Sequence, residues 1–339
     1  MTWNACTMIQ KRIKAGNQTL LQQIQDYKNT NQAYWEKRAC SYSELNQHQL
    51  KSAQHIVWKD FIDQLIQDHL SDQAAKPCAC DKRQQHQQQG VQSAAPQNIQ
   101  AQVQQCRLRG TQQSAQQSVF IRKNIKVLDI GTGPGFFAII LAQLGYQVSA
   151  IDYTHNMLEE ARSNAGLFKD EIEFIQMNAE ELNFPDESFD LVISRNLSWN
   201  LVRPLLAYKH WARVLKPGGL LLNFDANWYH YLFKSQAKEA RLQDREHVKL
   251  AGIQDDTAGT DTVTMEALAK KAPLSQRERP AWDLAVLNYL GLEASADTQV
   301  YKQLWSLDEW INNASTPLFL VQAKKPLVSL ANKTEGLSS

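Results

Sequence analysis

The stretch Lys126-Val-Leu-Asp-Ile-Gly-Thr-Gly-Pro-Gly-Phe-Phe137 decides the fold of this chain. Mostly apolar residues run into Asp129, glycines follow at positions 131, 133 and 135, and apolar residues with helical spacing come next. Because glycine has no Cβ, the backbone here can approach a ligand closely. Amide groups at the start of a helix favour polar or charged ligand groups. The stretch therefore predicts a strand, a ligand-binding turn and a helix.

Strands and helices alternate beyond this stretch. The expected strands are 126–130, 147–151, 172–176, 189–194, 220–225, one from 292 and one at 318–323, and the expected helices are 136–144, 154–165, 204–215 and 281–290. This alternation implies right-handed crossovers and a mainly parallel sheet. The last two strands have no full helix expected between them, so we predict an antiparallel pair at the sheet edge. The predicted fold is α/β, a Rossmann-like doubly wound sheet with an antiparallel edge strand.

Three further regions surround this predicted domain of residues 119–325. Residues 1–72 are expected to form a helical cover, in which 50–70 is an amphipathic helix. Its apolar positions are Ile56, Val57, Phe61, Ile62, Leu65 and Ile66. Residues 226–279 interrupt the alternation and are expected to form a cap over the acceptor side, and the tail 326–339 is expected to fray.

Residues 73–118 are dominated by glutamine, with alanine and serine filling much of the rest. Such a segment has few large apolar side chains with which to offset the entropy of ordering. We predict a low-complexity insertion that is disordered or loosely helical. Cys78, Cys80 and His86 lie inside it, but metal binding needs a scaffold that fixes ligand geometry. We therefore interpret the segment as a linker and expect no metal.

Composition bounds the class of protein. The 339 residues carry a formal net charge of +1, so nothing global predicts a nucleic-acid partner, and no apolar run reaches the roughly 18 residues that span a bilayer. Lys11, Arg12 and Lys14 are not followed by an apolar core, which argues against a secretory signal, although a transit peptide stays open. Five scattered cysteines suggest reduced thiols. We expect a cytoplasmic protein of undetermined oligomeric state.

Two cofactor classes use a glycine turn after the first strand. A dinucleotide fold places its third glycine in the pattern G-x-G-x-x-G, but residue 136 is Phe. Asp129-Ile-Gly131-Thr-Gly133-Pro-Gly135 instead resembles the first motif of the class I S-adenosylmethionine-dependent methyltransferases. The resemblance implies that the loop wraps the methionine part of S-adenosylmethionine.

Further features follow in the order that this family has. Asp152 ends the second strand, 21 residues after Gly131, where a carboxylate can accept two hydrogen bonds from ribose hydroxyls; it could instead serve only as an acid at a helix N-terminus. The resemblance also implies that Asn178 and Ala179 meet adenine, whereas Glu180 could be an ordinary surface residue. The segments 184–190 and 214–219 are similar to family turns and are structural marks.

The N-terminal segment 34–42 (Tyr34-Trp35-x-x-Arg38-Ala39-x-x-Tyr42) is similar to the ubiquinone/menaquinone-biosynthesis-like group, in which an N-terminal helix covers the cofactor. Tyr42 or Trp35 is then a pocket residue, or else simply packs the helix; an aromatic face also suits a sulfonium. The full set of cofactor-binding residues predicted from the motifs and the resemblance is Asp129, Gly131, Gly133, Gly135, Asp152, Tyr153, Met157, Asn178, Ala179, Glu180, Arg195 and Tyr42.

The acceptor side is less well defined. Residues 194–200 lack the N/D/S-P-P-aromatic motif found in enzymes that methylate adenine or glutamine, which argues against those acceptors. Arg195 and Asn196 could line the pocket, or Arg195 could pair with Asp190 or Asp225. A general base is needed only if the acceptor must lose a proton. The candidates are Asp225, Tyr229 and His155, followed by His210 and His230, and each histidine could equally be structural.

The aromatic cluster Trp228, Tyr229 and Tyr231 could form an acceptor wall or the core of the cap. These features predict transfer of a methyl group from S-adenosylmethionine to a small molecule. The alternatives are a non-catalytic module that binds the cofactor, a methyltransferase acting on a thiol or metalloid, and a nicotinamide-dependent oxidoreductase, which Phe136 disfavours.

Overall fold

The structure, a computed structural model, describes residues 3–74 and 122–327. The predicted insertion 73–118 lies outside these ranges except for its first two residues, and so does most of the predicted tail. Among the described residues, no helix combines the length and the apolar character needed to cross a bilayer.

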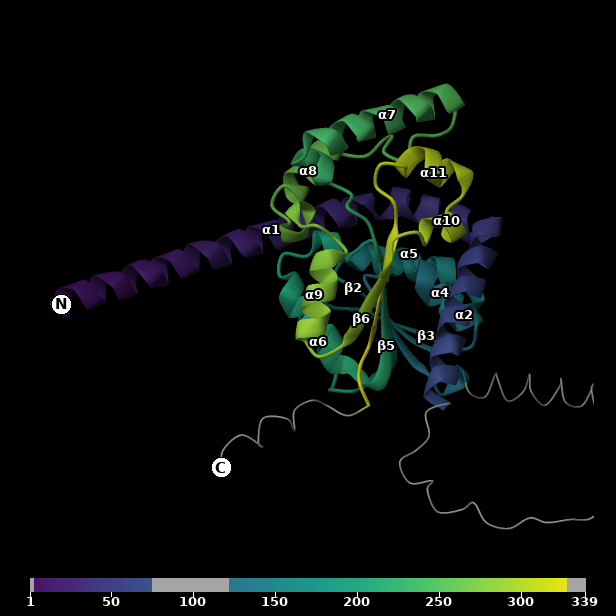
Figure 1. Ribbon diagram of the computed structural model, residues 1–339, viewed down its shortest axis with the longest axis horizontal. Helices are drawn as coiled ribbons and strands as arrows, with labels where there is room; N and C mark the ends of the chain where they lie inside the picture. The colour runs from purple at the N-terminus through teal and green to yellow at the C-terminus, as the bar shows by residue number, and fades with distance from the viewer. Residues whose placement is uncertain (1–2, 75–121, 328–339) are drawn as a thin grey trace, which may run out of the picture.

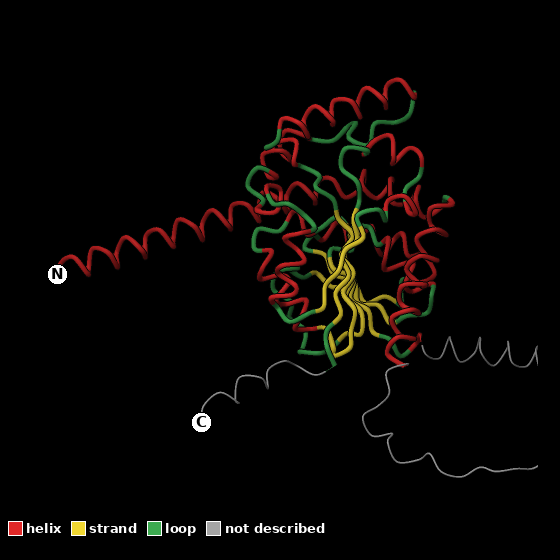
Figure 2. The backbone as a smooth tube through the Cα atoms, in the orientation of Figure 1, coloured by secondary structure: helices red, strands yellow, loops and turns green. Residues whose placement is uncertain are grey.

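A seven-stranded sheet forms the centre of the protein in the order β3-β2-β1-β4-β5-β7-β6 (Figure 2). The strands are β1 Lys126–Ile130, β2 Gln147–Asp152, β3 Ile172–Gln176, β4 Phe189–Arg195, β5 Leu215–Asp225, β6 Glu293–Asp297 and β7 Phe319–Lys324. β1 pairs in parallel with both β2 and β4, whereas β7 runs antiparallel to its neighbours β5 and β6. This arrangement confirms the predicted mainly parallel, doubly wound sheet. The antiparallel strand β7 lies one position inside the edge, and β6 forms the edge itself.

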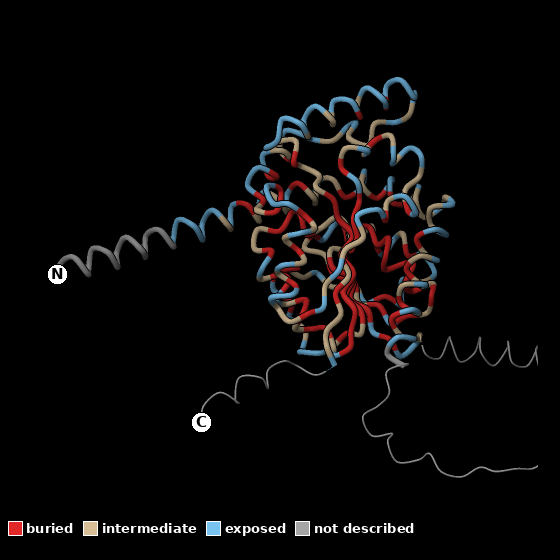
Figure 3. Tube along the Cα trace, viewed as in Figure 1, coloured by how far each residue is buried: buried red, intermediate tan, exposed pale blue. Residues whose placement is uncertain are grey.

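Helices cover both faces of the sheet (Figure 1). The helices are α1 Trp3–Lys51, α2 Ala53–Ala74, α4 Phe136–Gln143, α5 His155–Ala165, α6 Pro204–Val214, α7 Ser235–Ala251, α8 Thr262–Ala269, α9 Ala281–Tyr289, α10 Tyr301–Leu304 and α11 Leu307–Asn313. Side chains alternate along each strand, so Val127 packs with α2, α4 and α10 on one face while Leu128 packs with α6 and α9 on the other. The strands and the inner faces of these helices are buried (Figure 3).

Helix α2 lies where an amphipathic helix was predicted, but its buried face is rotated. Trp58, Ile62 and Ile66 are 0–3% exposed, whereas Ile56 and Val57 are 59% and 39% exposed. The prediction was wrong at the last two positions. Trp58 adds the largest apolar side chain to the buried stripe at positions 58, 62 and 66, and it contacts Phe136, Phe137 and Phe224.

Two other expectations need correction. Strand β5 begins at Leu215 instead of residue 220, because Leu215 already pairs with Phe189 across an irregularity in the register. Between β6 and β7 the chain forms the short helices α10 and α11, where no full helix was expected. Helix α11 begins at a capping box in which Ser306 and Glu309 bond each other's backbone amides.

Residues 226–279 contain α7 and α8 together with the 3-10 helices η3 His230–Leu232 and η4 Pro273–Gln276. Helix α8 packs on α1, and both contribute to a cluster formed by Tyr27, Tyr34, Met265 and Leu268. This segment and the N-terminal helix therefore meet above the carboxyl ends of the strands. The N-terminal part of α1 projects away from the rest of the protein (Figure 1).

Candidate functional site

The glycine turn follows β1 and is held in a conformation that disfavours side chains. Gly131 and Gly133 have φ angles of +68° and +52°, which residues with a Cβ rarely adopt. A Cβ added to Gly131 would also lie 2.7 Å from the Leu197 side chain. A Cβ on Gly133 would face Tyr42 of α1 at 3.8 Å. The turn therefore borders an open space that α1 covers.

That space is a cavity of about 900 Å³, counting the solvent-filled volume at its mouth. It is lined by residues from α1, the glycine turn and the carboxyl ends of β2, β3 and β4. The predicted residues that line it are Tyr42, Gly131, Gly133, Asp152, Tyr153, Met157, Asn178, Ala179, Glu180 and Arg195, and Trp35 and Asn196 line it as well. Sequence reasoning missed Tyr27, Lys28, Asn31 and Gln32. Their spacing, continued by Trp35, puts them on one face of α1.

Two predicted cofactor residues, Asp129 and Gly135, do not line the cavity. The Asp129 carboxylate is 2% exposed and accepts hydrogen bonds from Thr132 Oγ1 at 2.6 Å and Ala138 N at 3.0 Å. Burial raises the pKa of Asp129 to about 7. Gly135 instead lets the start of α4 approach Ala161, because a Cβ there would lie 3.1 Å from the Ala161 Cβ. Both residues shape the turn from inside the protein.

Asp152 lies at the end of β2 and faces the cavity. Its Oδ2 accepts from Gly133 N at 3.0 Å, and its Oδ1 accepts from the amide and hydroxyl of Thr154 at 2.9 and 2.8 Å. Burial raises the pKa of Asp152, and these hydrogen bonds oppose the rise. A carboxylate has about four lone-pair sites, so one remains free for a ligand hydroxyl. Thr154 precedes α5, and its hydroxyl donates to Asp152 instead of capping the helix.

The end of β3 forms the opposite wall. Asn178 and Ala179 line it, and Ala179 O accepts from the Trp211 indole at 2.9 Å. Glu180 is not a surface residue, because it is only 3% exposed. Its carboxylate accepts from the amides of Val202 and Arg203 and forms an ion pair with Lys28 of α1 at 3.0 Å. Glu180 therefore joins β3, α6 and α1 behind the cavity wall.

Polar contacts fasten α1 across the cavity. The Glu36 carboxylate accepts from the first amides of α5, His155 N and Asn156 N, at 2.8 Å each, where negative charge also favours the helix dipole. Gln32 donates to Tyr153 O at 3.2 Å, and the Tyr27 hydroxyl donates to Asn200 O at 3.0 Å. The helix is thus anchored at both sides of the cavity that it covers.

The end of β4 supplies Arg195 and Asn196. Arg195 pairs with neither expected acid, because Asp190 binds Lys216 at 2.8 Å and Asp225 binds Arg279 at 2.6 Å. Its guanidinium instead lies between aromatic rings beside the cavity. Asn196 has a φ of +55°, and its buried Oδ1 has no hydrogen-bond partner.

The three main catalytic candidates lie outside the cavity. His155 is exposed at the start of α5. Tyr229 packs against Trp199 with ring centroids 4.6 Å apart and the planes tilted by 40°, within the cluster between α1 and α8, and burial raises its pKa above the ordinary range. Asp225 is fully buried. None of the three lines the cavity in this structure, and the identity of a general base stays a prediction.

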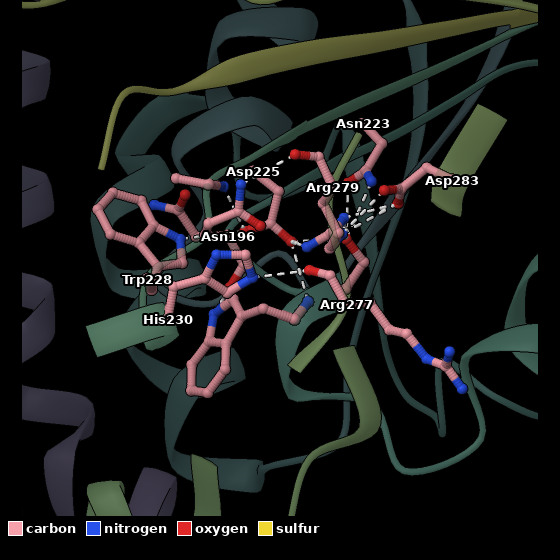
Figure 4. Close-up of polar contacts among 12 residues, drawn as sticks. Asn196, Asn223, Asp225, Trp228, His230, Arg277, Arg279 and Asp283 are labelled. Carbon is pink, nitrogen blue, oxygen red and sulfur yellow. Dashed lines mark hydrogen bonds and ion pairs between the residues drawn. The ribbon is translucent and has the colours of Figure 1, made fainter. Parts of the chain in front are cut away.

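Asp225 belongs to a buried polar network that joins the cap to the sheet (Figure 4). Arg279 is 5% exposed and donates to Asp225 Oδ2 at 2.6 Å, to Asp283 Oδ1 at 2.7 Å and to Ser198 Oγ at 2.7 Å. Asp225 Oδ2 also accepts from Ser198 Oγ and from Trp199 N. Because residues 196–202 include much of the cavity wall, the network holds that wall in place.

The remaining weak candidates are also structural. His230 Nε2 lies 2.7 Å from Arg277 O, and because a carbonyl oxygen only accepts, His230 donates through Nε2. His210 lies beside the Arg213 guanidinium, and burial lowers its pKa. Within the described part of the chain, no three Asp, Glu, His or Cys residues are grouped as a metal site.

Residues 128–223 match the family described as "Methyltransferase domain". These residues contain the glycine turn, Asp152, the β3 wall and the end of β4. Over these residues the chain matches a methyltransferase domain. The match confirms the resemblance that the motifs predicted, and with it S-adenosylmethionine as the cofactor of the domain.

Three proteins similar to parts of this chain illustrate the match. The chain is 40% identical over 99 residues to a demethylmenaquinone methyltransferase of Clavibacter sepedonicus, covering 29% of this chain and 39% of that protein. It is 39% identical over 123 residues to the ubiquinone/menaquinone biosynthesis C-methyltransferase UbiE of Psychromonas ingrahamii, covering 34% of this chain and 48% of that protein. A longer match, 26% identical over 205 residues, covers 58% of this chain and 68% of the uncharacterized methyltransferase YcgJ of Bacillus subtilis. The chain thus spans less than half the length of the first two relatives.

Proposed function

We propose that this chain transfers a methyl group from S-adenosylmethionine to a small-molecule acceptor. The observation that carries the proposal is the single cavity shared by the glycine turn, Asp152, the β3 wall and the end of β4. In this assignment Asp152 accepts from a ribose hydroxyl at its remaining lone-pair site, Asn178 and Ala179 contact the adenine, and Gly131 and Gly133 let the backbone approach the methionine part. Bound S-adenosylmethionine supplies an electrophilic methyl group on a positively charged sulfur.

The residues of this chain contribute position and exclusion of water. Helix α1 covers the cavity from Tyr27 to Tyr42, and its anchors to α5 and Asn200 keep bulk solvent out. Trp35 and Tyr42 meet edge to face with centroids 5.6 Å apart and line the cavity. Their rings suit a cationic sulfonium. Holding the acceptor in line with the methyl group in such an enclosed space accounts for most of the acceleration expected of this reaction.

A small acceptor is supported by the cover and by the relatives. A cavity roofed by a helix that also packs on α8 admits a small molecule more readily than a folded macromolecule. The two relatives above 35% identity are named for methylation in quinone biosynthesis, so a cyclic acceptor is the first class to examine. That the acceptor is a small molecule, and that it is cyclic, are both part of this proposal.

The test is methyl transfer from labelled S-adenosylmethionine to a fractionated small-molecule extract, followed by identification of the labelled product. We expect label in one or a few compounds of low mass. Binding of S-adenosylhomocysteine without transfer to any fraction would instead support the alternative of a non-catalytic module.

A further inference from the structure

Arg195 is a buried cation held in a fixed plane at the acceptor end of the cavity. Its side chain is 16% exposed. Its Cζ lies 4.6 Å from the centroids of both Trp58 and Phe136, two rings that meet edge to face, so the aromatic rings hold the guanidinium from neighbouring directions. These ring contacts do not satisfy its N–H groups, which still need hydrogen-bond acceptors.

Those N–H groups have few partners. A guanidinium offers five N–H donors, but within the described residues Arg195 makes one hydrogen bond, from Nη1 to Gln49 Oε1 at 3.2 Å, and its buried Nε has no partner there. The carboxylate oxygen within reach, Glu309 Oε1, lies 4.0 Å from Nη2 and already accepts from Gln49 Nε2 at 2.9 Å. Burial lowers the pKa of Arg195, and the charge of Glu309 opposes this decrease only in part. A buried cation with so few hydrogen-bond acceptors destabilises the folded protein unless a ligand supplies the missing acceptors.

Arg38 adds a second cation beside the same wall. Its Cζ lies 5.7 Å from the centroid of Tyr42, a cavity residue. Nη1 donates to the Tyr34 hydroxyl at 3.1 Å, Nε is buried without a partner, and within the described residues Arg38 makes no ion pair. Tyr42 also interacts with the charge of Arg195. Two arginines without close carboxylates therefore adjoin one aromatic ring at the cavity.

The cofactor brings no net negative charge to the cavity. The ammonium and carboxylate of its methionine part cancel each other, and the sulfonium adds one more positive charge. Among the described residues that line the cavity, the carboxylates are Asp152 and Glu180; Asp152 binds Gly133 and Thr154, and Glu180 binds Lys28, Val202 and Arg203, so neither pairs with Arg195. The acceptor that enters the cavity can supply the negative charge that Arg195 lacks.

We propose that Arg195, supported by Arg38, binds an oxyanion of the methyl acceptor, such as a carboxylate or an ionised ring hydroxyl. This inference rests on the proposed function and narrows its acceptor to anionic small molecules. An ionised acceptor also fits the position of Asp225, Tyr229 and His155 outside the cavity, because an acceptor that arrives already ionised needs no general base. Arg195 is then a specificity-determining residue.

The test separates the acceptors by charge. A small-molecule extract is passed over a strong anion exchanger at pH 8, and the bound and unbound fractions are each supplied with labelled S-adenosylmethionine and the full chain. We expect label transfer from the bound fraction, at least 100-fold slower with Arg195→Gln and intermediate with Arg195→Lys, which keeps the charge. Arg162→Gln, which removes an exposed arginine of α5, should leave the rate unchanged. Transfer from the unbound fraction alone would overturn the proposal.

The cofactor carboxylate is the competing source of an oxyanion, and binding measurements distinguish it. Arg195→Gln should change the Kd of S-adenosylhomocysteine less than threefold. A loss of more than tenfold for S-adenosylhomocysteine, with none for 5′-methylthioadenosine, which lacks the amino-acid part, would assign Arg195 to the cofactor and overturn the proposal. Unchanged Kd values for the variant also show that it is folded.

If the wild-type chain transfers label from neither fraction, the proposed function fails and the oxyanion site is judged by binding alone. The protein saturated with S-adenosylhomocysteine is then titrated with benzoate and with its neutral analogue benzamide. The proposal predicts at least tenfold tighter binding of benzoate, and loss of that preference in Arg195→Gln. Equal affinity for the two probes, or no binding of benzoate, would overturn it.

Discussion

Replacing Arg279 with methionine should destabilise the folded protein strongly. Arg279 lies between the carboxylates of Asp225 and Asp283, both 0% exposed, and makes hydrogen bonds of 2.6–2.9 Å to them. Methionine keeps much of the apolar stem but leaves two buried acids without their cation. Removal of one partner from a buried ion pair costs about 3–5 kcal/mol. At about 2–4 °C per kcal/mol for a domain of this size, the Tm should fall by about 10 °C.

Urea unfolding at pH 7, followed by circular dichroism, measures this loss directly. The matched control is Arg162→Met, which breaks an exposed pair with Glu159 and should cost about 0–1 kcal/mol. Adding Asp283→Asn to Arg279→Met should recover part of the loss, because the uncompensated charge is reduced. If Arg279→Met and Arg162→Met lower the unfolding free energy equally, the reasoning about the buried network is refuted.

Three further predictions concern the cavity and its turn. Asp152→Ala should raise the Kd of S-adenosylhomocysteine more than tenfold, at least about 1.4 kcal/mol; an unchanged Kd in a calorimetric titration would contradict the ribose assignment. Asp129 has a folded-state pKa raised by burial to about 7 from 3.8, so its contribution to stability is present below about pH 4 and is lost as the pH rises through 7. The unfolding free energy of the wild type, measured in urea, should therefore fall relative to that of Asp129→Asn by up to about 1.4 kcal/mol per pH unit between pH 4 and 7. Unfolding free energies of the two proteins that change in parallel with pH would contradict this. Glu36→Gln removes the negative charge from the start of α5, and we expect faster dissociation of S-adenosylhomocysteine in stopped-flow measurements; an unchanged rate would show that this anchor does not hold the cover closed.

The sheet and the glycine turn were predictable because their determinants are local. The apolar run into Asp129, the glycine spacing and the acid at 152 each lie within one strand–turn–helix unit. The positive φ angles at Gly131 and Gly133 follow directly from the motif. The Ser306–Glu309 capping box was also readable from the sequence and could have revealed α11.

The roof and the buried network were not predictable, because they depend on contacts between distant segments. Tyr27 meets Asn200 across 173 positions of the chain, and Arg279 meets Asp225 across 54. In the sequence, Asp225 has the position of a catalytic acid at a strand end. Only the structure shows that it pairs with Arg279. The face of α1 that lines the cavity is polar and gives no periodic apolar pattern. From the sequence alone, such a face cannot be distinguished from one exposed to solvent.

The wrong prediction that Ile56 and Val57 are buried has a local cause. Ile56, Val57 and Trp58 are adjacent, and only Trp58 is buried. Adjacent residues on a helix point about 100° apart, so the register of the stripe is set by which residue fits the core. The aromatic contacts of Trp58 with Phe136, Phe137 and Phe224 decide that register here.

A competitive calorimetric titration tests the central claim that this cavity binds S-adenosylmethionine and not a dinucleotide. The full chain is titrated with S-adenosylhomocysteine, alone and after saturation with NADH, and the same titration is repeated with Asp152→Ala. We predict one saturable site for S-adenosylhomocysteine that NADH does not affect and that Asp152→Ala weakens. Absence of binding by S-adenosylhomocysteine, or its displacement by NADH, would contradict the account.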